Sequence, residues 1–287
     1  MRTGPNFGPY HSWESIKAFD AISEKAFALF DERTSAELQR LSRPVHHLFI
    51  RIGYQAKTTS LGIRLSNSWA LCLPALALVR VRLEQTIICS FLVHENEEVG
   101  LRPFVAYIPI GQHMGLKAAM EDPKLAAQLA GLFDLGRSET EAVQTQQDLT
   151  PGFTVAGDKF QRNWTKLDLR SMANRRDTLV STKGALRGHS LEREYLSFYK
   201  VASSVVHADC SSLSYAFLDV FQVPNTQPVL MAVPAWALIV AAATAHYDVL
   251  QCLEILTWLG IDAEQGYQTL FEQWVAARDK YVQGGQP

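Results

Sequence analysis

The sequence lacks the short motifs that are typical of the common catalytic folds. It contains no P-loop, no GxGxxG, no GxSxG elbow and no ExxH or HExxH metal motif. The four cysteines form no CxxC pair, which excludes the usual cysteine-based zinc and redox motifs. Asn-Gly turns and long Val/Ile/Thr alternation are also missing, so β-hairpins are not expected. We therefore expect no metal and no cofactor, and cysteines that act as small core residues in a reducing, cytoplasmic environment.

An excess of charge of one sign is also absent. The 287 residues carry a formal net charge of −2, with 47% hydrophobic and 20% charged residues, which is typical of a globular chain and not of a strongly basic nucleic-acid binder. The opening segment MRTGPNFGPYHSWES has no apolar core of a signal peptide. One long apolar run, residues 229–245, is slightly short for a membrane span and contains Pro234. We expect it to be a buried core helix, with no membrane partner.

Helical periodicity is abundant, and it predicts an all-α, multi-helix bundle of about seven to nine helices. The pattern predicts one domain over residues 1–287, with a flexible segment at 1–11 and a polar, turn-rich surface excursion at 134–159. Pro44 is expected to end the first helix. The expected helices are 12–41, 45–54, 68–93, 100–108, 114–133, 160–178, 189–220, 230–260 and 263–283.

Charged residues interrupt one very apolar helix. Only Arg80, Arg82 and Glu84 are charged between Ala70 and Val93. Arg80 and Glu84 are four residues apart and share a helix face, whereas Arg82 points about 200° away from Arg80. Because a helix this apolar must bury most of its surface, each charge on it needs a partner. The Arg80–Glu84 pair is expected either to grip a neighbouring helix or to position a substrate.

A second apolar helix carries a polar stripe in the segment YKVASSVVHADCSS. Tyr199, Ser203 and His207 are spaced by four, and Lys200 and His207 by seven, so all four side chains lie near one face. An imidazole can act as an acid or a base near neutral pH. The stripe predicts either a catalytic site or a buried hydrogen-bond network.

Basic residues gather just before this helix. Lys159 to Arg193 contains nine Lys or Arg and three Asp or Glu, a local balance of nine minus three, or +6. Such a segment is either an ordinary solvated surface or a place for an anionic ligand. Under the second interpretation, we expect Arg170, Arg175 and Arg176 to bind nucleic acid.

Taken in order, these features resemble a bacterial all-helical family that is catalogued only as a domain of unknown function. The resemblance rests on Arg-x-x-x-Glu (Arg80, Glu84), the stretch NWTKLDLRSMA with Trp164, and Tyr-x-x-x-Ser-x-x-x-His (Tyr199, Ser203, His207), and it spans roughly residues 68–218. It implies a shared helical fold and a shared polar cluster.

A more distant resemblance is to the HEPN (higher eukaryotes and prokaryotes nucleotide-binding) superfamily, whose motif is Arg, four to six residues, then His on one helix. Lys200 and His207 have this spacing, with lysine in place of arginine. The resemblance implies a metal-independent endoribonuclease of a bacterial defence or stress system, acting on RNA as a homodimer. It implies that His207 and Lys200 are catalytic, that Ser203 or Tyr199 orients the imidazole, and that Arg80 and Glu84 support them.

Two alternatives stay open at this stage. One is a non-catalytic helical module that binds a protein partner and uses the polar cluster to fix helix register. The other is a small-molecule pocket beside His207.

Overall fold

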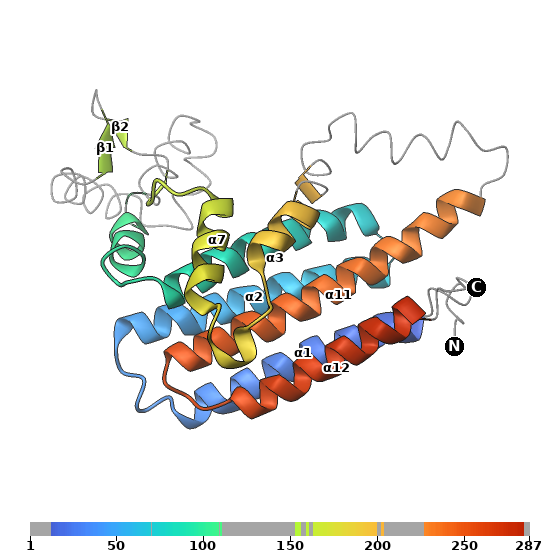
Figure 1. Ribbon diagram of the computed structural model, residues 1–287, viewed down its shortest axis with the longest axis horizontal. Helices are drawn as coiled ribbons and strands as arrows, with labels where there is room; N and C mark the ends of the chain where they lie inside the picture. Colours follow the sequence, from blue (N-terminus) through green and yellow to red (C-terminus); the bar gives the residue numbers. More distant parts are fainter. Residues whose placement is uncertain are drawn as a thin grey trace, which may run out of the picture. The chain divides into compact units, whose positions relative to one another are not determined.

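The computed structural model describes residues 13–69, 71–108, 110, 153–155, 159–160, 163–199, 202–203 and 227–283. Over these residues the predicted all-α bundle is confirmed (Figure 1). The chain divides into two compact units, Met1–His94 with Leu169–Pro287 and Glu95–Asp168, where the sequence predicted one domain. Residues 1–11, most of 134–159, the expected helix at 114–133 and residues 204–220 lie outside the described residues.

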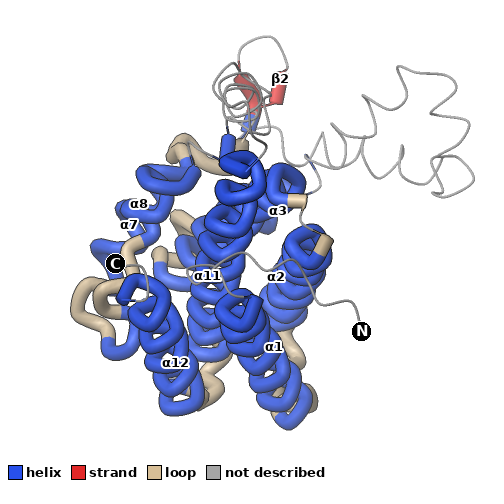
Figure 2. Tube along the Cα trace, turned by 90° about the vertical axis from the view of Figure 1, so that its right-hand side faces the viewer, coloured by secondary structure: helices blue, strands red, loops and turns tan. Residues whose placement is uncertain are grey.

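The first unit is a bundle arranged around one long helix, α11. Figure 2 shows α11 in the middle of the bundle, where it packs against α1, α2, α3 and α12. The elements of this unit are α1 (Trp13–Ala36), α2 (Pro44–Ser68), α3 (Cys72–His94), α7 (Leu169–Val180), the 3-10 turn η1 (Gly184–Leu186), α8 (Leu191–Glu194), the π-helical turn η2 (Tyr195–Tyr199), α11 (Gln227–Trp258) and α12 (Glu264–Gln283).

The boundary between α1 and α2 differs from the prediction. Helix α1 ends at Ala36, and Pro44 begins α2 as its first residue. This position suits proline because the N–H of the first helical residue has no acceptor within the helix, so its absence costs no hydrogen bond. Helix α2 also continues past residue 54, where the expected helix ended, and runs through the stretch KTTS (residues 57–60) to Ser68. The hydroxyls of Thr58 and Thr59 donate to the carbonyls of Tyr54 and Gln55, so these polar side chains are satisfied within the helix.

The core follows the apolar stripes of the helices. The apolar stripe of α1 is buried throughout, at Ile16, Phe19, Ile22, Phe27 and Phe30. Close packing of α1 on α2 requires a glycine, because a Cβ at Gly53 would lie 2.7 Å from the Phe30 ring. In α11, Trp236–Trp258 is long and apolar enough to cross a membrane, but 89% of that window is buried, as predicted for a core helix.

Glycine also ends α11. Gly260 has φ +70, its N–H donates to the Thr257 carbonyl, and the N–H of Ile261 donates to the Leu256 carbonyl. This pair of bonds is a Schellman motif, and it turns the chain directly into α12.

The second unit is described in part. Residues 101–108 are helical, as predicted. Thr154–Val155 (β1) and Lys159–Phe160 (β2) form a two-residue antiparallel pair that the sequence did not predict. The helix expected from residue 160 begins only at Leu169. Within the unit, the buried Trp164 ring packs edge-on against Phe104 at 5.3 Å.

Candidate functional site

The polar cluster that the sequence predicted across two helices forms in the structure. Arg80 and Glu84 lie one turn apart on α3, and Arg80 Nε donates to Glu84 Oε1 at 3.0 Å. Tyr199, the last residue of η2, reaches both side chains. Its hydroxyl accepts a hydrogen bond from Arg80 Nη2 at 3.1 Å and donates one to Glu84 Oε1 at 2.9 Å. The prediction that these three residues meet is confirmed.

This Arg80–Glu84–Tyr199 cluster is half-buried. The side chains of Arg80 and Glu84 are 18% and 30% exposed. Burial disfavours the guanidinium, but hydrogen bonds with Tyr199 and Glu84 more than offset it and raise the pKa of Arg80. Burial, assisted by Glu84, raises the pKa of Tyr199, so the phenol stays protonated at neutral pH. The cluster thus holds an ion pair and a neutral hydroxyl in fixed positions at the edge of solvent.

An aromatic stack fixes the tyrosine further. The ring of Tyr195 stacks on that of Tyr199 with centroids 4.5 Å apart, and the Arg80 guanidinium lies 5.0 Å from the Tyr199 centroid. Both tyrosines lie in the π-helical turn, a backbone form that is frequent at functional sites. The predicted neighbour Ser203 is half-buried and helical, whereas Lys200 and His207 lie outside the described residues.

The three arginines predicted to bind nucleic acid separate into two groups. Arg170 and Arg175 are exposed on α7, and Arg170 Nε donates to Glu192 at 3.1 Å. Arg176 is fully buried. Its guanidinium forms an ion pair with Glu254 on α11. The prediction for Arg176 is therefore wrong in this structure, because a side chain with no exposed surface cannot contact a phosphate backbone.

Arg176 is the centre of a buried network between α7, α11 and α3. Its Nε donates to Glu254 Oε1 at 3.0 Å, and Ser90 Oγ donates to the same carboxylate. His94 Nε2 lies 3.3 Å from Glu254 Oε1. Burial works to raise the pKa of Glu254, but Arg176, His94 and Ser90 together lower it to about 2. Glu254 is therefore ionised and paired.

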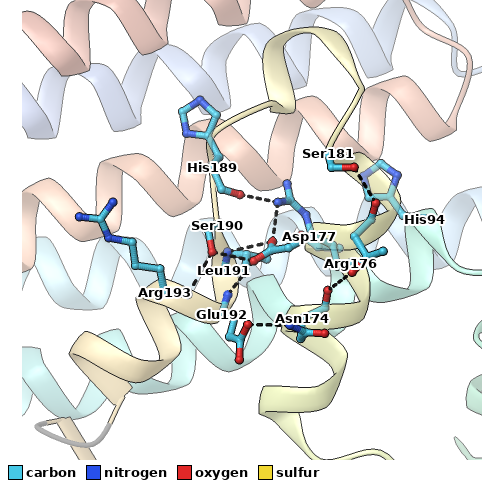
Figure 3. A network of polar contacts seen from close by, with 12 residues as sticks. His94, Asn174, Arg176, Asp177, Ser181, His189, Ser190, Leu191, Glu192 and Arg193 are labelled. Carbon is cyan, nitrogen blue, oxygen red and sulfur yellow. Dashed lines mark hydrogen bonds and ion pairs between the residues drawn. The ribbon is translucent and has the colours of Figure 1, made fainter.

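The same arginine organises the chain that follows α7 (Figure 3). Arg176 Nη1 donates to the carbonyl of His189 at 2.5 Å and to Asp177 Oδ1 at 3.1 Å. Asp177 in turn accepts from Ser190 Oγ at 2.7 Å and from the N–H groups of Leu191 and Glu192 at 3.0 Å. These bonds anchor the start of α8. The His189 ring points away from Arg176 and Asp177.

A second buried network joins α1, α2, α3 and α11. Arg82 Nε donates to Asp248 Oδ1 at 2.9 Å, and neither side chain is exposed. Ser60 Oγ donates to Asp248 Oδ1 at 2.7 Å, and Ser23 Oγ donates to Oδ2. Arg82 also donates to Thr86, to Gln251 and to the Tyr247 carbonyl. Burial raises the pKa of Asp248 while Arg82 opposes that shift.

Two histidines meet beside a groove. His189 Nδ1 lies 2.9 Å from His246 Nε2, and the His189 ring stacks on Phe271 at 4.1 Å. Burial, together with His189 and Arg176, lowers the pKa of His246 to about 3, and burial and Arg176 lower that of His189. Both rings are therefore neutral at pH 7. The groove has a volume of about 820 Å³ and is lined by Gly184, Arg187, Gly188, His189, Gln268, Phe271, Glu272, Val275, Ala276 and Asp279.

The described residues offer no metal centre. Among them, no group of three or more His, Cys, Asp or Glu side chains could hold an ion. Cys89 and Cys252 are buried, free thiols, as predicted. The chemistry available in this part of the chain is that of fixed cations, carboxylates, phenols and imidazoles.

Sequence reasoning missed the partners of the buried charges, although signals for them existed. Asp248, Gln251 and Glu254 recur every third residue on the otherwise apolar helix α11, and such a stripe must be paired when the helix is central. No family model, curated protein or solved structure matches the chain. Function therefore has to be argued from the residues themselves.

Proposed function

We propose that this protein is an HEPN-like, metal-independent endoribonuclease that acts on RNA in the cytoplasm, as part of a bacterial defence or stress system. The observation that carries the proposal is the half-buried Arg80–Glu84–Tyr199 cluster. Tyr199 begins the sequence segment that holds Lys200, Ser203 and His207. The Arg80–Glu84 ion pair holds the Tyr199 hydroxyl in place at the start of this segment, and a protonated phenol in a fixed position can orient a neighbouring imidazole.

The proposed chemistry is an internal transfer on the RNA backbone. His207 takes the proton of a ribose 2′-hydroxyl, and the oxygen attacks the adjacent phosphorus. The bond from phosphorus to the 5′-oxygen breaks, and the leaving oxygen takes up a proton from water, which leaves a 2′,3′-cyclic phosphate and a 5′-hydroxyl. Lys200 offsets the charge that grows on the phosphoryl oxygens. Ser203 or Tyr199 orients the imidazole, and Tyr199 is itself held by Arg80 and Glu84.

Binding of the RNA backbone is assigned to the exposed arginines of α7. Arg170 has a side chain that is 55% exposed, and Arg175 is also exposed. Arg176 is excluded because it is buried. The HEPN resemblance further implies a homodimer, which we include in the proposal.

The test is cleavage of single-stranded RNA by the purified chain, in the presence of a metal chelator. We expect His207→Ala to lower the rate by about 10²-fold or more. His47→Ala is the matched control, because His47 is an exposed histidine on α2, and it should cleave like the unmodified chain. If cleavage needs added metal, or if both variants lose it equally, the proposed mechanism is wrong.

A second candidate is a non-catalytic helical module that binds a protein partner. The two fully buried ion pairs Arg82–Asp248 and Arg176–Glu254 show that this fold uses charged pairs to join separate helices. The observation that favours the candidate is that Tyr199 bonds to both Arg80 and Glu84 and so joins η2 to α3 in the same way. In this candidate, the three residues serve only that structural purpose. It predicts no cleavage of any RNA by the unmodified chain, and a large loss of stability in Glu84→Ala.

A further inference from the structure

The outer side of α2 exposes a row of large apolar side chains. Tyr54, Leu61, Leu65 and Trp69 are 44%, 47%, 54% and 77% exposed. Their spacing of seven, four and four residues places them along one stripe of the helix. Single exposed apolar residues are ordinary on a protein surface, but Leu61, Leu65 and Trp69 follow one another turn by turn, and such a grouping is typical of a binding surface.

Helix α3 packs closely against α2 and extends the same exposed apolar surface. A Cβ on Gly62 would lie 3.3 Å from Leu78 Cδ1, and Gln85 Nε2 donates to Thr59 Oγ1 at 3.2 Å. Figure 2 shows the two helices side by side on one flank of the bundle. The residues that α3 and its preceding turn add are the exposed Leu71, Pro74 and Val81 and the half-buried Leu78, Gln85 and Ile88.

None of these side chains is charged, and we call them together the α2–α3 face. Charge begins at its margins, with Arg51 one turn before Tyr54, Lys57 and Arg64 along the flank of α2, and Arg80 and Glu84 beside Val81. The solvent side of a surface helix normally carries charged residues. Depletion of charge together with exposed tryptophan and tyrosine is instead the composition of the core of a protein interface.

We propose that the α2–α3 face is where a second copy of this chain docks. From Leu71 to Ile88 the face is about 25 Å long, and two helices side by side are about 20 Å wide, which gives about 500 Å² in projection. A corrugated surface with projecting side chains has more accessible area than its projection, so the face approaches the roughly 800 Å² that each partner of a standard interface buries.

Symmetry favours a second copy over another occupant. A two-fold axis sets the same patch against itself, so charges on the face would meet like charges, and the α2–α3 face carries none. A lipid surface is disfavoured because membrane-binding helices flank their apolar side with an excess of lysine and arginine. At the margin of the α2–α3 face, Lys57, Arg64 and Arg80 are paired with the carboxylates of Asp31, Glu24 and Glu84, which leaves little positive charge for anionic lipid.

Docking here would bring the partner close to the candidate site. Val81 follows Arg80 directly and precedes Glu84 by one turn of α3, so the cluster lies at the margin of the interface. The inference thereby names the surface of the proposed homodimer. It rests on that homodimer and not on RNA cleavage.

The experiment is analytical ultracentrifugation of the full chain over a range of concentrations up to sub-millimolar. We expect a species of twice the 32.1 kDa chain mass. In Leu65→Glu and in Trp69→Glu, the dissociation constant of this dimer should be higher by about 30-fold or more. Leu38→Glu is the matched control, because Leu38 is 53% exposed against 54% for Leu65 but lies beyond the opposite end of α2. It should dimerise like the unmodified chain.

Each other outcome overturns the inference. A chain that stays monomeric at all these concentrations has no such interface. A dimer that survives both Leu65→Glu and Trp69→Glu uses another surface. Monomers that sediment with vesicles of phosphatidylcholine and phosphatidylserine, and lose this in Trp69→Glu, assign the face to lipid. Because cleavage of RNA is measured separately, its presence or absence does not affect these results.

Discussion

Replacing Asp248 by alanine should destabilise the protein far more than replacing Glu84 by alanine, although each change removes a carboxylate that binds an arginine of α3. Asp248 and Arg82 are fully buried, whereas Glu84 and Arg80 are partly exposed. Removing one partner of a buried pair leaves the other charge without compensation and away from water. Removing one partner of an exposed pair allows water to replace it.

The contacts set the magnitudes. Asp248→Ala leaves Arg82 with Ser60, Thr86, Gln251 and the Tyr247 carbonyl, none of which carries a charge. The expected loss is about 3–5 kcal/mol, the range measured for broken buried pairs. Glu84→Ala leaves Arg80 bonded to the Tyr199 hydroxyl. The expected loss there is about 1 kcal/mol or less, as for i,i+4 pairs near solvent.

Urea unfolding followed by far-ultraviolet circular dichroism measures both values. With a slope of about 3 kcal/mol per molar urea, a loss of about 4 kcal/mol moves the midpoint by about 1.3 M. The double change Arg82→Met with Asp248→Leu is the control, because removing both charges should restore most of the stability. If Asp248→Ala and Glu84→Ala move the midpoint equally, the reasoning from burial is refuted.

Three further predictions concern pH, salt and catalysis. The fold lowers the pKa of His246 to about 3 from the ordinary 6.5, so the unfolded chain binds the extra proton. The stability that neutral His246 contributes should therefore be fully present above pH 6.5 and should be lost as the pH drops towards 3. The urea midpoint of His246→Phe should then fall less steeply with decreasing pH than that of the unmodified chain; equal pH slopes would contradict this. If RNA binds, Arg170→Ala and Arg175→Ala should each lower the slope of log affinity against log salt by about 1, measured by fluorescence polarisation; an unchanged slope in both variants argues against a backbone contact. Tyr199→Phe should slow RNA cleavage about 10-fold or more while its urea midpoint changes little, whereas His47→Ala, at an exposed histidine of α2, should leave the rate unchanged; unimpaired cleavage in Tyr199→Phe would exclude a role in orienting His207.

The helices were predictable because their apolar spacing is regular, and their ends were less so. Pro44 can end one helix or begin the next, and the sequence alone does not distinguish these cases. The stretch KTTS looked like a break because threonine hydroxyls compete for backbone hydrogen bonds. In α2 they bond to carbonyls four residues back, which is compatible with a continuous helix.

The candidate site was predictable where its geometry is local. Arg80 and Glu84 share a helix face by spacing alone, and this needs no tertiary information. The partners of Arg82 and Arg176 lie on α11, 166 and 78 residues away, and no local rule reaches that distance. Arg176 nevertheless stands on the stripe of α7 that includes the buried Met172, Ala173 and Val180, a position that indicates burial.

The contrast between the two kinds of polar cluster separates the functional hypotheses. Arg82–Asp248 is sealed from water and joins four helices, so a change there acts on folding whatever the protein does. The Arg80–Glu84–Tyr199 cluster meets solvent and should contribute little to stability. A change at Tyr199 that abolishes an activity but leaves the urea midpoint unmoved therefore reports on chemistry or binding. The same change with a large loss of stability would instead place the cluster with the structural networks and favour the non-catalytic module.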